Sequence, residues 1–252
     1  MKREDLDYNA AEFAPEEDNV FGRIAGRYDR LCDIFSFGIH RQWKSKMARA
    51  MAREQASFIL DVASGTGDIP LRYLRQKKRN PDARLLVSDI CPEMLEVAQG
   101  KLEGKDDGLR FKVLNAYDMA SIEDNSVDLY SISFAMKICD RELVLKEAFR
   151  VLKPGGTFFC LEASQIPIRF IHNAYLAYMD WCMPIIGRLA AEGDASAYQY
   201  LLKGVHDFPN QRELAEEIRR YGFMDVSFES LTFGITALHR AVKPPFAGVG
   251  TP

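Results

Sequence analysis

One strand–loop–helix–strand unit constrains the fold of this chain more than any other feature. An apolar run, Ile59–Val62, leads into a small-residue loop that contains Gly65 and Gly67. A helix-like segment follows, and a second apolar run ends at Asp89, roughly twenty residues beyond the loop. In a parallel sheet such a unit brings a ligand-binding turn and a carboxylate to the carboxyl edge, where nucleosides bind.

The loop differs from the loops that bind phosphate groups. Pro70 stands where G-x-G-x-x-G needs its third glycine, and no Gly-Lys-Ser/Thr follows. Asp61 and Asp68 flank the glycines and place negative charge where a pyrophosphate would lie. This pattern disfavours a nicotinamide-dependent dehydrogenase. A nucleoside with a sulfonium and an amino group fits better, so we expect S-adenosyl-L-methionine, with S-adenosyl-L-homocysteine as the product.

Candidate cofactor-binding residues lie at or just after the ends of three successive predicted strands. The glycines allow the backbone to approach a ligand closely, Asp61 suits the cationic methionine end, and Asp89 can accept hydrogen bonds from both ribose hydroxyls. The adenine edge is expected near Asn115. The candidates at these three strand ends are Asp61, Gly65, Thr66, Gly67, Asp89, Ile90, Asn115 and Ala116. In the alternative interpretation the glycines form only a tight turn and Asp89 caps a helix.

Apolar runs and helical periodicity alternate along the chain, which predicts an α/β fold. We expect a doubly wound, mostly parallel sheet of seven strands, with two C-terminal strands forming an antiparallel edge. Strands are predicted near 57–62, 84–89, 110–114, 127–133, 156–162, 224–230 and 232–241. Helices are predicted near 68–78, 92–103, 140–152 and 210–221, and Lys153–Gly156 is predicted to be a sharp turn.

The predicted organisation is an N-terminal helical cap (1–56), a main domain (57–243) and a flexible tail (244–252). A helical insertion at about 165–205 precedes the C-terminal strands. Its core, 166–187, is rich in apolar and aromatic residues. This composition fits a lid that covers an isoprenoid tail and that itself contacts a membrane surface weakly. It also fits a helix packed on the core or a homodimer face.

Bulk properties narrow the class of protein. The 252 residues are 47% hydrophobic, with a formal net charge of −3, which argues against a nucleic-acid-binding protein. The five cysteines form no C-x-x-C pair and the four histidines are far apart, so no metal site is expected. We find neither a signal sequence nor an apolar run long enough for a transmembrane helix. These features predict a cytoplasmic enzyme, with peripheral contact at the inner membrane surface left open.

At the level of motifs, the chain resembles class I S-adenosylmethionine-dependent methyltransferases, and within them the ubiquinone/menaquinone biosynthesis C-methyltransferases. The resemblance covers roughly residues 20–243. The matching stretches are Tyr28-Asp29, Ser36–Lys44, Asp61–Asp68, Asn115-Ala116, Arg150–Gly156, Tyr198–Leu201, Phe208–Gln211, Gly222-Phe223 and Leu231–His239. The resemblance implies a Rossmann-like methyltransferase fold. It also implies cofactor contacts for the residues that match the family's positions, which are Thr66, Asp89, Asn115, Ala116 and Ser133.

The chain departs from the family after the fourth main strand, where Phe-Gly-x-Arg-Asn is usual and Phe134–Ile138 reads Phe-Ala-Met-Lys-Ile. Lys137 keeps a positive charge but lacks the planar fork of arginine. It is the first catalytic candidate, as an electrostatic helper or a base, and the alternative is a solvated lysine. His239 is a second candidate, but it lies on a predicted strand, which favours a hydrogen-bonded core histidine. Weaker candidates are Tyr178, Tyr200 and Asp118.

The resemblance implies C-methylation of a polyprenyl benzoquinol or naphthoquinol ring in quinone biosynthesis. Two alternatives stay open. The altered residues at 137 and 138 favour a methyltransferase that acts on a different small aromatic substrate. Loss of the Arg-Asn pair also fits a scaffold subunit that binds the cofactor without catalysis.

Overall fold

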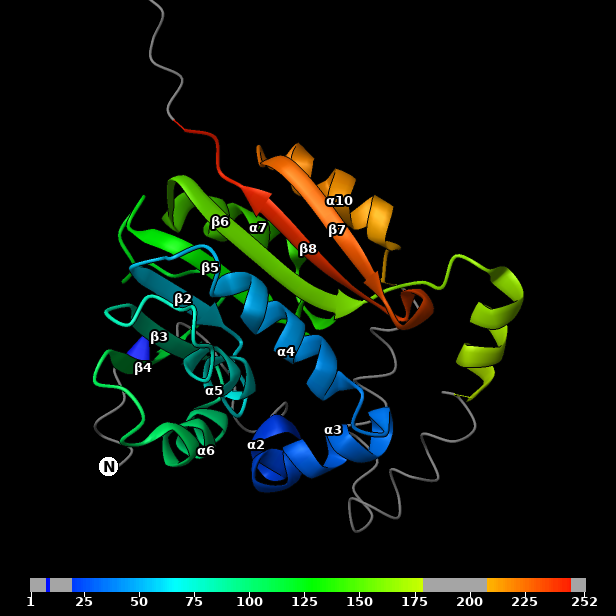
Figure 1. The fold of residues 1–252 in the computed structure, drawn as a ribbon, viewed down its shortest axis with the longest axis horizontal. Coiled ribbons are helices and arrows are strands. Elements are labelled where there is room, and N and C mark those ends of the chain that lie inside the picture. Colours follow the sequence, from blue (N-terminus) through cyan, green and yellow to red (C-terminus); the bar gives the residue numbers. More distant parts are fainter. Residues whose placement is uncertain (1–7, 10–19, 179–207, 246–252) are drawn as a thin grey trace, which may run out of the picture.

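The computed structural model describes residues 8–9, 20–178 and 208–245 (Figure 1). Most of the insertion predicted at 165–205 and most of the tail predicted at 244–252 lie outside these residues. Only the beginning of the insertion is described, and its residues 169–178 form a helix that stands apart from the sheet. No helix within the described ranges combines the length and apolar character needed to cross a membrane.

One twisted sheet organises the described chain, with the strand order β1-β4-β3-β2-β5-β6-β8-β7. Every neighbouring pair is parallel except β8, which runs antiparallel to both β6 and β7. The strands are β1 (Tyr8–Asn9), β2 (Phe58–Val62), β3 (Arg84–Asp89), β4 (Leu109–Leu114), β5 (Val127–Ser133), β6 (Leu152–Ala163), β7 (Met224–Leu231) and β8 (Thr236–Val242). The predicted doubly wound sheet is confirmed. Its seven strands are β2 to β8, and the two-residue β1 is added beside β4.

Helices cover both faces of the sheet (Figure 1). Along β2, Ile59 packs into a core with α4, α5 and α6, whereas Leu60 packs into a second core with α7 and α10. This alternation is what a strand buried on both faces requires. The helices are α2 (Val20–Ile24), α3 (Tyr28–Ser36), α4 (His40–Met51), α5 (Asp68–Leu74), α6 (Pro92–Leu102), α7 (Arg141–Val151) and α10 (Gln211–Arg220). Short 3₁₀ turns are η2 (Ala25–Arg27), η3 (Met136–Ile138) and η4 (Thr232–Gly234).

Two boundaries differ from the sequence prediction for local reasons. The predicted turn at Lys153–Gly156 is part of β6, because the Gly155 amide donates to the Lys243 carbonyl at 2.9 Å and so extends pairing with β8. Strand β8 begins at Thr236 rather than at 232. Thr232 and Phe233 adopt left-handed backbone angles (φ 46° and 59°), which a strand does not accommodate.

Candidate active site

The glycine loop after β2 has an open side and a packed side. Gly65 and Gly67 both have positive φ angles (55° and 75°). A Cβ on Gly65 would meet no atom within 4 Å, whereas a Cβ on Gly67 would lie 3.0 Å from both Ala98 and Leu102 of α6. Gly65 therefore leaves room for a ligand, and Gly67 allows the loop to pack closely on α6.

Asp89, at the end of β3, connects this loop with the beginning of α6. Its Oδ2 accepts the Gly65 amide at 2.7 Å, and its Oδ1 accepts the Cys91 amide at 2.9 Å. The carboxylate is 8% exposed, and burial raises its pKa above the ordinary value. Each carboxylate oxygen has a second lone pair. Holding the helix and accepting ribose hydroxyls are thus compatible roles.

Asp61 lies beneath the loop and is 1% exposed. Its carboxylate accepts hydrogen bonds from Ser131 Oγ at 2.5 Å and from Ser64 Oγ. Burial raises the pKa of Asp61 to about 6, although both serine hydroxyls oppose that shift. Asp61 is absent from the lining of the cavity described below. Through its two serine partners it joins the glycine loop to β5.

The remaining predicted cofactor residues lie at the carboxyl ends of other strands. Asn115 and Ala116 directly follow β4, and Asn115 Oδ1 accepts the Tyr117 amide at 2.9 Å. Ile90 follows β3 and Ser133 ends β5. Since β4, β3, β2 and β5 are consecutive in the sheet, all these strand ends lie along one edge. The sheet order therefore brings the predicted set to one side of the molecule.

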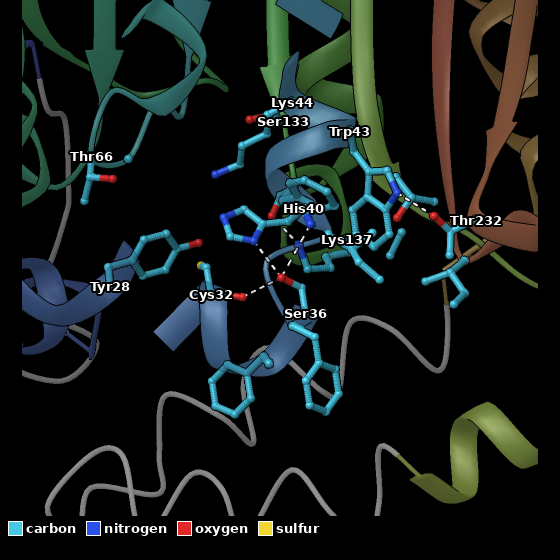
Figure 2. A pocket seen from close by; sticks show the side chains of 18 of the residues that line it. Tyr28, Cys32, Ser36, His40, Trp43, Lys44, Thr66, Ser133, Lys137 and Thr232 are labelled. Carbon is cyan, nitrogen blue, oxygen red and sulfur yellow. Dashed lines mark hydrogen bonds between the residues drawn. The ribbon is translucent and has the colours of Figure 1, made fainter. Parts of the chain in front are cut away.

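Beside the loop lies a cavity of about 330 Å³ (Figure 2). Residues of the glycine loop, α3, α4, the end of β5 and η4 contribute to it. Most of its wall is aromatic or aliphatic, with a smaller number of polar groups. The aromatic members are Tyr28, Phe35, Phe37, Trp43, Phe134, Tyr175 and Tyr178, and the polar ones include Ser36, His40, Lys44, Thr66, Ser133 and Lys137. An apolar cavity with a few convergent polar groups is typical of a small-molecule site.

Lys137, on η3, belongs to the cavity wall. Its Nζ lies 3.2 Å from Glu162 Oε1, and the side chains of the pair are 6% and 1% exposed. Nζ also donates to the Phe134 carbonyl. Phe134 itself has a left-handed backbone (φ 56°), and such strain tends to occur at functional sites. The fold thus holds this ammonium in a buried, paired position, which differs from the solvated lysine of the alternative interpretation.

The other catalytic candidates are distributed differently. His239 is 1% exposed and is absent from the cavity lining. Its Nε2 lies 2.9 Å from the Gln211 carbonyl, Nδ1 has no partner, and burial lowers its pKa to about 4. This environment is that of a core histidine. Asp118 is exposed in the loop after β4, Tyr178 lines the cavity, and Tyr200 lies outside the described residues.

Sequence reasoning missed a group of cavity residues at the beginning of α4. His40, Trp43 and Lys44 all line the cavity. Trp43 donates its indole N–H to Thr232 Oγ1 at 2.8 Å, and Lys44 pairs with Asp68 at 3.0 Å. Their spacing of three and four residues puts them on one helical face. That periodicity of polar and aromatic residues was the available signal.

Fold and site together define a class I S-adenosylmethionine-dependent methyltransferase. Two solved structures support the fold, each at 17% sequence identity. One is a SAM-dependent methyltransferase from Thermotoga maritima (TM-score 0.62; 89% of this chain and 98% of that chain). The other is an O-methyltransferase family protein from Burkholderia thailandensis (TM-score 0.59; 82% and 57%). More specifically, the chain belongs to the ubiE/COQ5 methyltransferase family, whose family model matches residues 12–243.

Curated relatives cover most of the chain. A 2-methoxy-6-polyprenyl-1,4-benzoquinol methylase from Caenorhabditis elegans mitochondria is 38% identical, over 94% of this chain and 83% of its own length. A ubiquinone/menaquinone biosynthesis C-methyltransferase from Acidiphilium cryptum is 40% identical, over 87% of each. The family resemblance predicted from motifs is therefore confirmed, and so is methyltransferase activity dependent on S-adenosylmethionine.

Proposed function

We propose that this enzyme methylates a ring carbon of a quinol, a polyprenyl benzoquinol or naphthoquinol, with S-adenosyl-L-methionine as the donor. One observation carries the proposal. The same cavity is lined by the open Gly65 loop and by aromatic side chains of α3, of α4 and of Phe134, which precedes η3. Donor and planar acceptor would therefore lie in the same cavity. The names of the benzoquinol methylase and C-methyltransferase relatives support the substrate class.

The loop fits the proposed cofactor because the space beside Gly65 is open and its neighbours offer matching polar groups. Asp89 is proposed to accept the ribose hydroxyls and Asn115-Ala116 to contact the adenine, with Thr66 and Ser133 nearer the methionine part. When bound, the cofactor supplies a methyl group already activated by a positive sulfur, which departs as a neutral thioether. The chain's own task is then to position and polarise the acceptor.

Lys137 is proposed to polarise the acceptor ring. Carbon methylation needs electron density at a ring carbon, and a cation near the phenolic oxygen favours the phenolate that supplies it. Nζ uses two of its three donors on Glu162 and Phe134. The third is then left for an acceptor oxygen. Glu162 would hold the ammonium at the cavity wall as the substrate changes charge.

The tail of such a substrate has to leave the cavity through an apolar surface. Ile168 and Phe170, at the start of the insertion, are 58% and 82% exposed, and Phe233 of η4 is 84% exposed. These residues support a weak peripheral contact with a membrane surface, made by an otherwise cytoplasmic enzyme. Flotation of the protein with anionic vesicles, compared between wild type and Phe170→Ser/Phe233→Ser, tests this contact. Equal flotation of the two proteins would contradict it.

The experiment for the reaction uses purified protein, S-adenosylmethionine labelled in its methyl group, and short-tailed benzoquinols and naphthoquinols kept reduced. We expect a product one methyl group heavier, with the label on a ring carbon by NMR. If the label appears on oxygen, or only on a phenol without a tail, the enzyme methylates a different aromatic substrate. Lys137 and Ile138, which stand where the family usually has Arg and Asn, support this alternative. Tight S-adenosylhomocysteine binding without turnover on any acceptor would favour the scaffold alternative.

A further inference from the structure

His40, the first residue of α4, lines the cavity and is joined to the last residue of α3, Ser36. The Ser36 Oγ lies 2.6 Å from His40 Nδ1 and 2.7 Å from the Cys32 carbonyl oxygen. In Figure 2 one nitrogen of the His40 ring is turned to Ser36, and the other is turned to the side of the pocket from which Tyr28 and Thr66 project.

The geometry at Ser36 fixes which ring nitrogen carries the hydrogen. A serine hydroxyl has one hydrogen to donate, and a carbonyl oxygen can only accept. The 2.7 Å contact with the Cys32 carbonyl therefore uses that hydrogen. At 2.6 Å the remaining partner, His40 Nδ1, has to be the donor to Ser36 Oγ. In a neutral imidazole this leaves Nε2 unprotonated, with a lone pair.

Within the described residues, the one hydrogen bond of the His40 ring is made by Nδ1, and Nε2 has no hydrogen-bond partner. Asp33 Oδ1 is 3.8 Å away, beyond hydrogen-bond distance, and that carboxylate is already paired with Arg41. Burial lowers the pKa of His40 to about 4; Lys44 and Arg72 lower it further, while Asp68 and Asp33 raise it. The imidazole is thus neutral at physiological pH.

The other titratable groups of the described cavity wall are proton donors. Lys44 and Lys137 are ammonium groups paired with carboxylates. The Tyr28 phenol lies beside the Cys32 thiol in a half-buried position, and the pKa of each of these two groups is raised. Burial raises the pKa of Tyr175 to about 12, and a tyrosine such as Tyr178 ordinarily keeps its proton at neutral pH. Within the described wall, His40 is the titratable side chain whose lone pair can take up a proton at neutral pH.

We propose that Nε2 of His40 is the base that removes the ring proton after methyl transfer, and that Ser36 is the residue that positions it. This inference rests on the proposed function. After transfer, the attacked carbon carries both the new methyl group and its original hydrogen. The C–H bond then breaks, its electron pair restores the aromatic ring, and an N–H bond forms at Nε2. The imidazolium afterwards releases the proton to solvent.

A base of low pKa suits this step. The ring intermediate is a strong acid because losing its proton restores aromaticity, so a weak base is sufficient to accept the proton. A base that were already protonated at working pH would be useless. A neutral imidazole held with Nε2 free satisfies both conditions. Aspartates 33 and 68, both paired with cations, would then stabilise the transient imidazolium.

The test is a kinetic isotope effect on a short-tailed benzoquinol that carries deuterium at the methylated carbon. In the wild type we expect methyl transfer to limit turnover and deuterium to have little effect. His40→Asn keeps an amide that can reach Ser36 but lacks the basic nitrogen. We expect kcat to fall by about 10²- to 10⁴-fold and a large primary isotope effect to emerge, with S-adenosylhomocysteine affinity unchanged. His172→Asn is the matched control, since His172 bonds the Ile166 amide and is absent from the cavity lining.

Ser36 is tested separately by a readout that does not depend on turnover. Nitrogen NMR of the free protein should show His40 protonated at Nδ1. Ser36→Ala should abolish that preference, Ser36→Thr should retain it, and Ser45→Ala, which removes a similar bond to the Arg41 carbonyl in α4, should not change it. Wild-type turnover together with an unchanged isotope effect in His40→Asn would overturn the role of His40 alone. A wild type that methylates no quinol would overturn the proposed function, and this inference with it.

Discussion

Asp89 accepts the backbone amide of Gly65 across the ends of two neighbouring strands, at 2.7 Å. The same carboxylate accepts the Cys91 amide, so one side chain shapes both the glycine loop and the start of α6. Replacing Asp89 by alanine removes the proposed ribose acceptors and leaves the Gly65 amide without its partner. We expect S-adenosylhomocysteine affinity to fall by more than about tenfold, as the loss of two hydrogen bonds predicts.

Calorimetric titration measures this loss, and Asp107→Ala in an exposed loop serves as the control. Asp89→Asn separates the two roles of the carboxylate, since its amide retains one acceptor oxygen for Gly65 or for the ribose. We expect an intermediate affinity for this variant. Wild-type affinity in Asp89→Ala would place the ribose elsewhere.

The two loop glycines should respond differently to the same substitution. At both positions alanine would have to adopt a left-handed backbone, which costs roughly 1–2 kcal/mol. Gly67→Ala adds a clash, because its Cβ would lie 3.0 Å from Ala98 and Leu102, so overpacking costs about 1–3 kcal/mol more. We expect Gly67→Ala to lower thermal stability more, and Gly65→Ala to lower cofactor affinity more. Thermal unfolding and calorimetry on both variants check this contrast, and the reverse ranking would contradict the assignment of the open side.

The sequence predicted the parts of this structure that depend on local signals. Ile59–Val62, the glycine loop and the strand ending at Asp89 are consecutive apolar runs and turns, so their order alone predicts a parallel unit and its carboxyl edge. The two-residue β1 could not be predicted in this way, because a strand of that length exists only through its partner β4.

The cavity wall depends on contacts between distant segments. Trp43 meets Thr232 across 189 positions, and Lys137 meets Glu162 across 25. Periodicity can assign Trp43 to a helical face, but it does not show what that face meets. His239 illustrates the converse, since its position on a predicted strand already favoured a core histidine over a catalytic one, and the fold buries it outside the cavity lining.

Lys137→Met should reduce turnover far more than cofactor affinity, because the proposed role of the ammonium begins with the acceptor. We expect a kcat at least about tenfold lower and an S-adenosylhomocysteine affinity within about threefold of wild type. The substitution also leaves the Glu162 carboxylate buried without its cation, which destabilises a protein by about 3–5 kcal/mol. Steady-state kinetics and thermal unfolding are therefore measured together.

The double variant Lys137→Met/Glu162→Gln distinguishes catalysis from folding. Glu162 accepts the Ala163 amide on one oxygen at 2.7 Å and the amide of residue 137 on the other at 3.3 Å. The neutral glutamine side chain has one acceptor oxygen, which can keep the shorter of these two bonds. We expect thermal stability to recover most of the loss while turnover stays low. Recovery of both would assign Lys137 a structural role only.

His239 should make stability depend on pH in mildly acidic solution. Burial lowers its pKa in the folded protein to about 4, below the ordinary value of about 6.5 that applies when the chain is unfolded. As pH falls from 6.5 towards 4, the unfolded chain therefore binds a proton that the folded protein does not, so the free energy of unfolding decreases. The full difference is on the order of 3 kcal/mol. His40 has a similarly lowered pKa and adds to this trend, whereas Asp61, with a raised pKa of about 6, opposes it. Urea unfolding measures the free energy of unfolding at pH 7 and at pH 4.5. Its decrease between these two pH values should be smaller for His239→Gln than for wild type. An equal decrease would mean that His239 binds its proton as readily in the folded protein as in the unfolded chain.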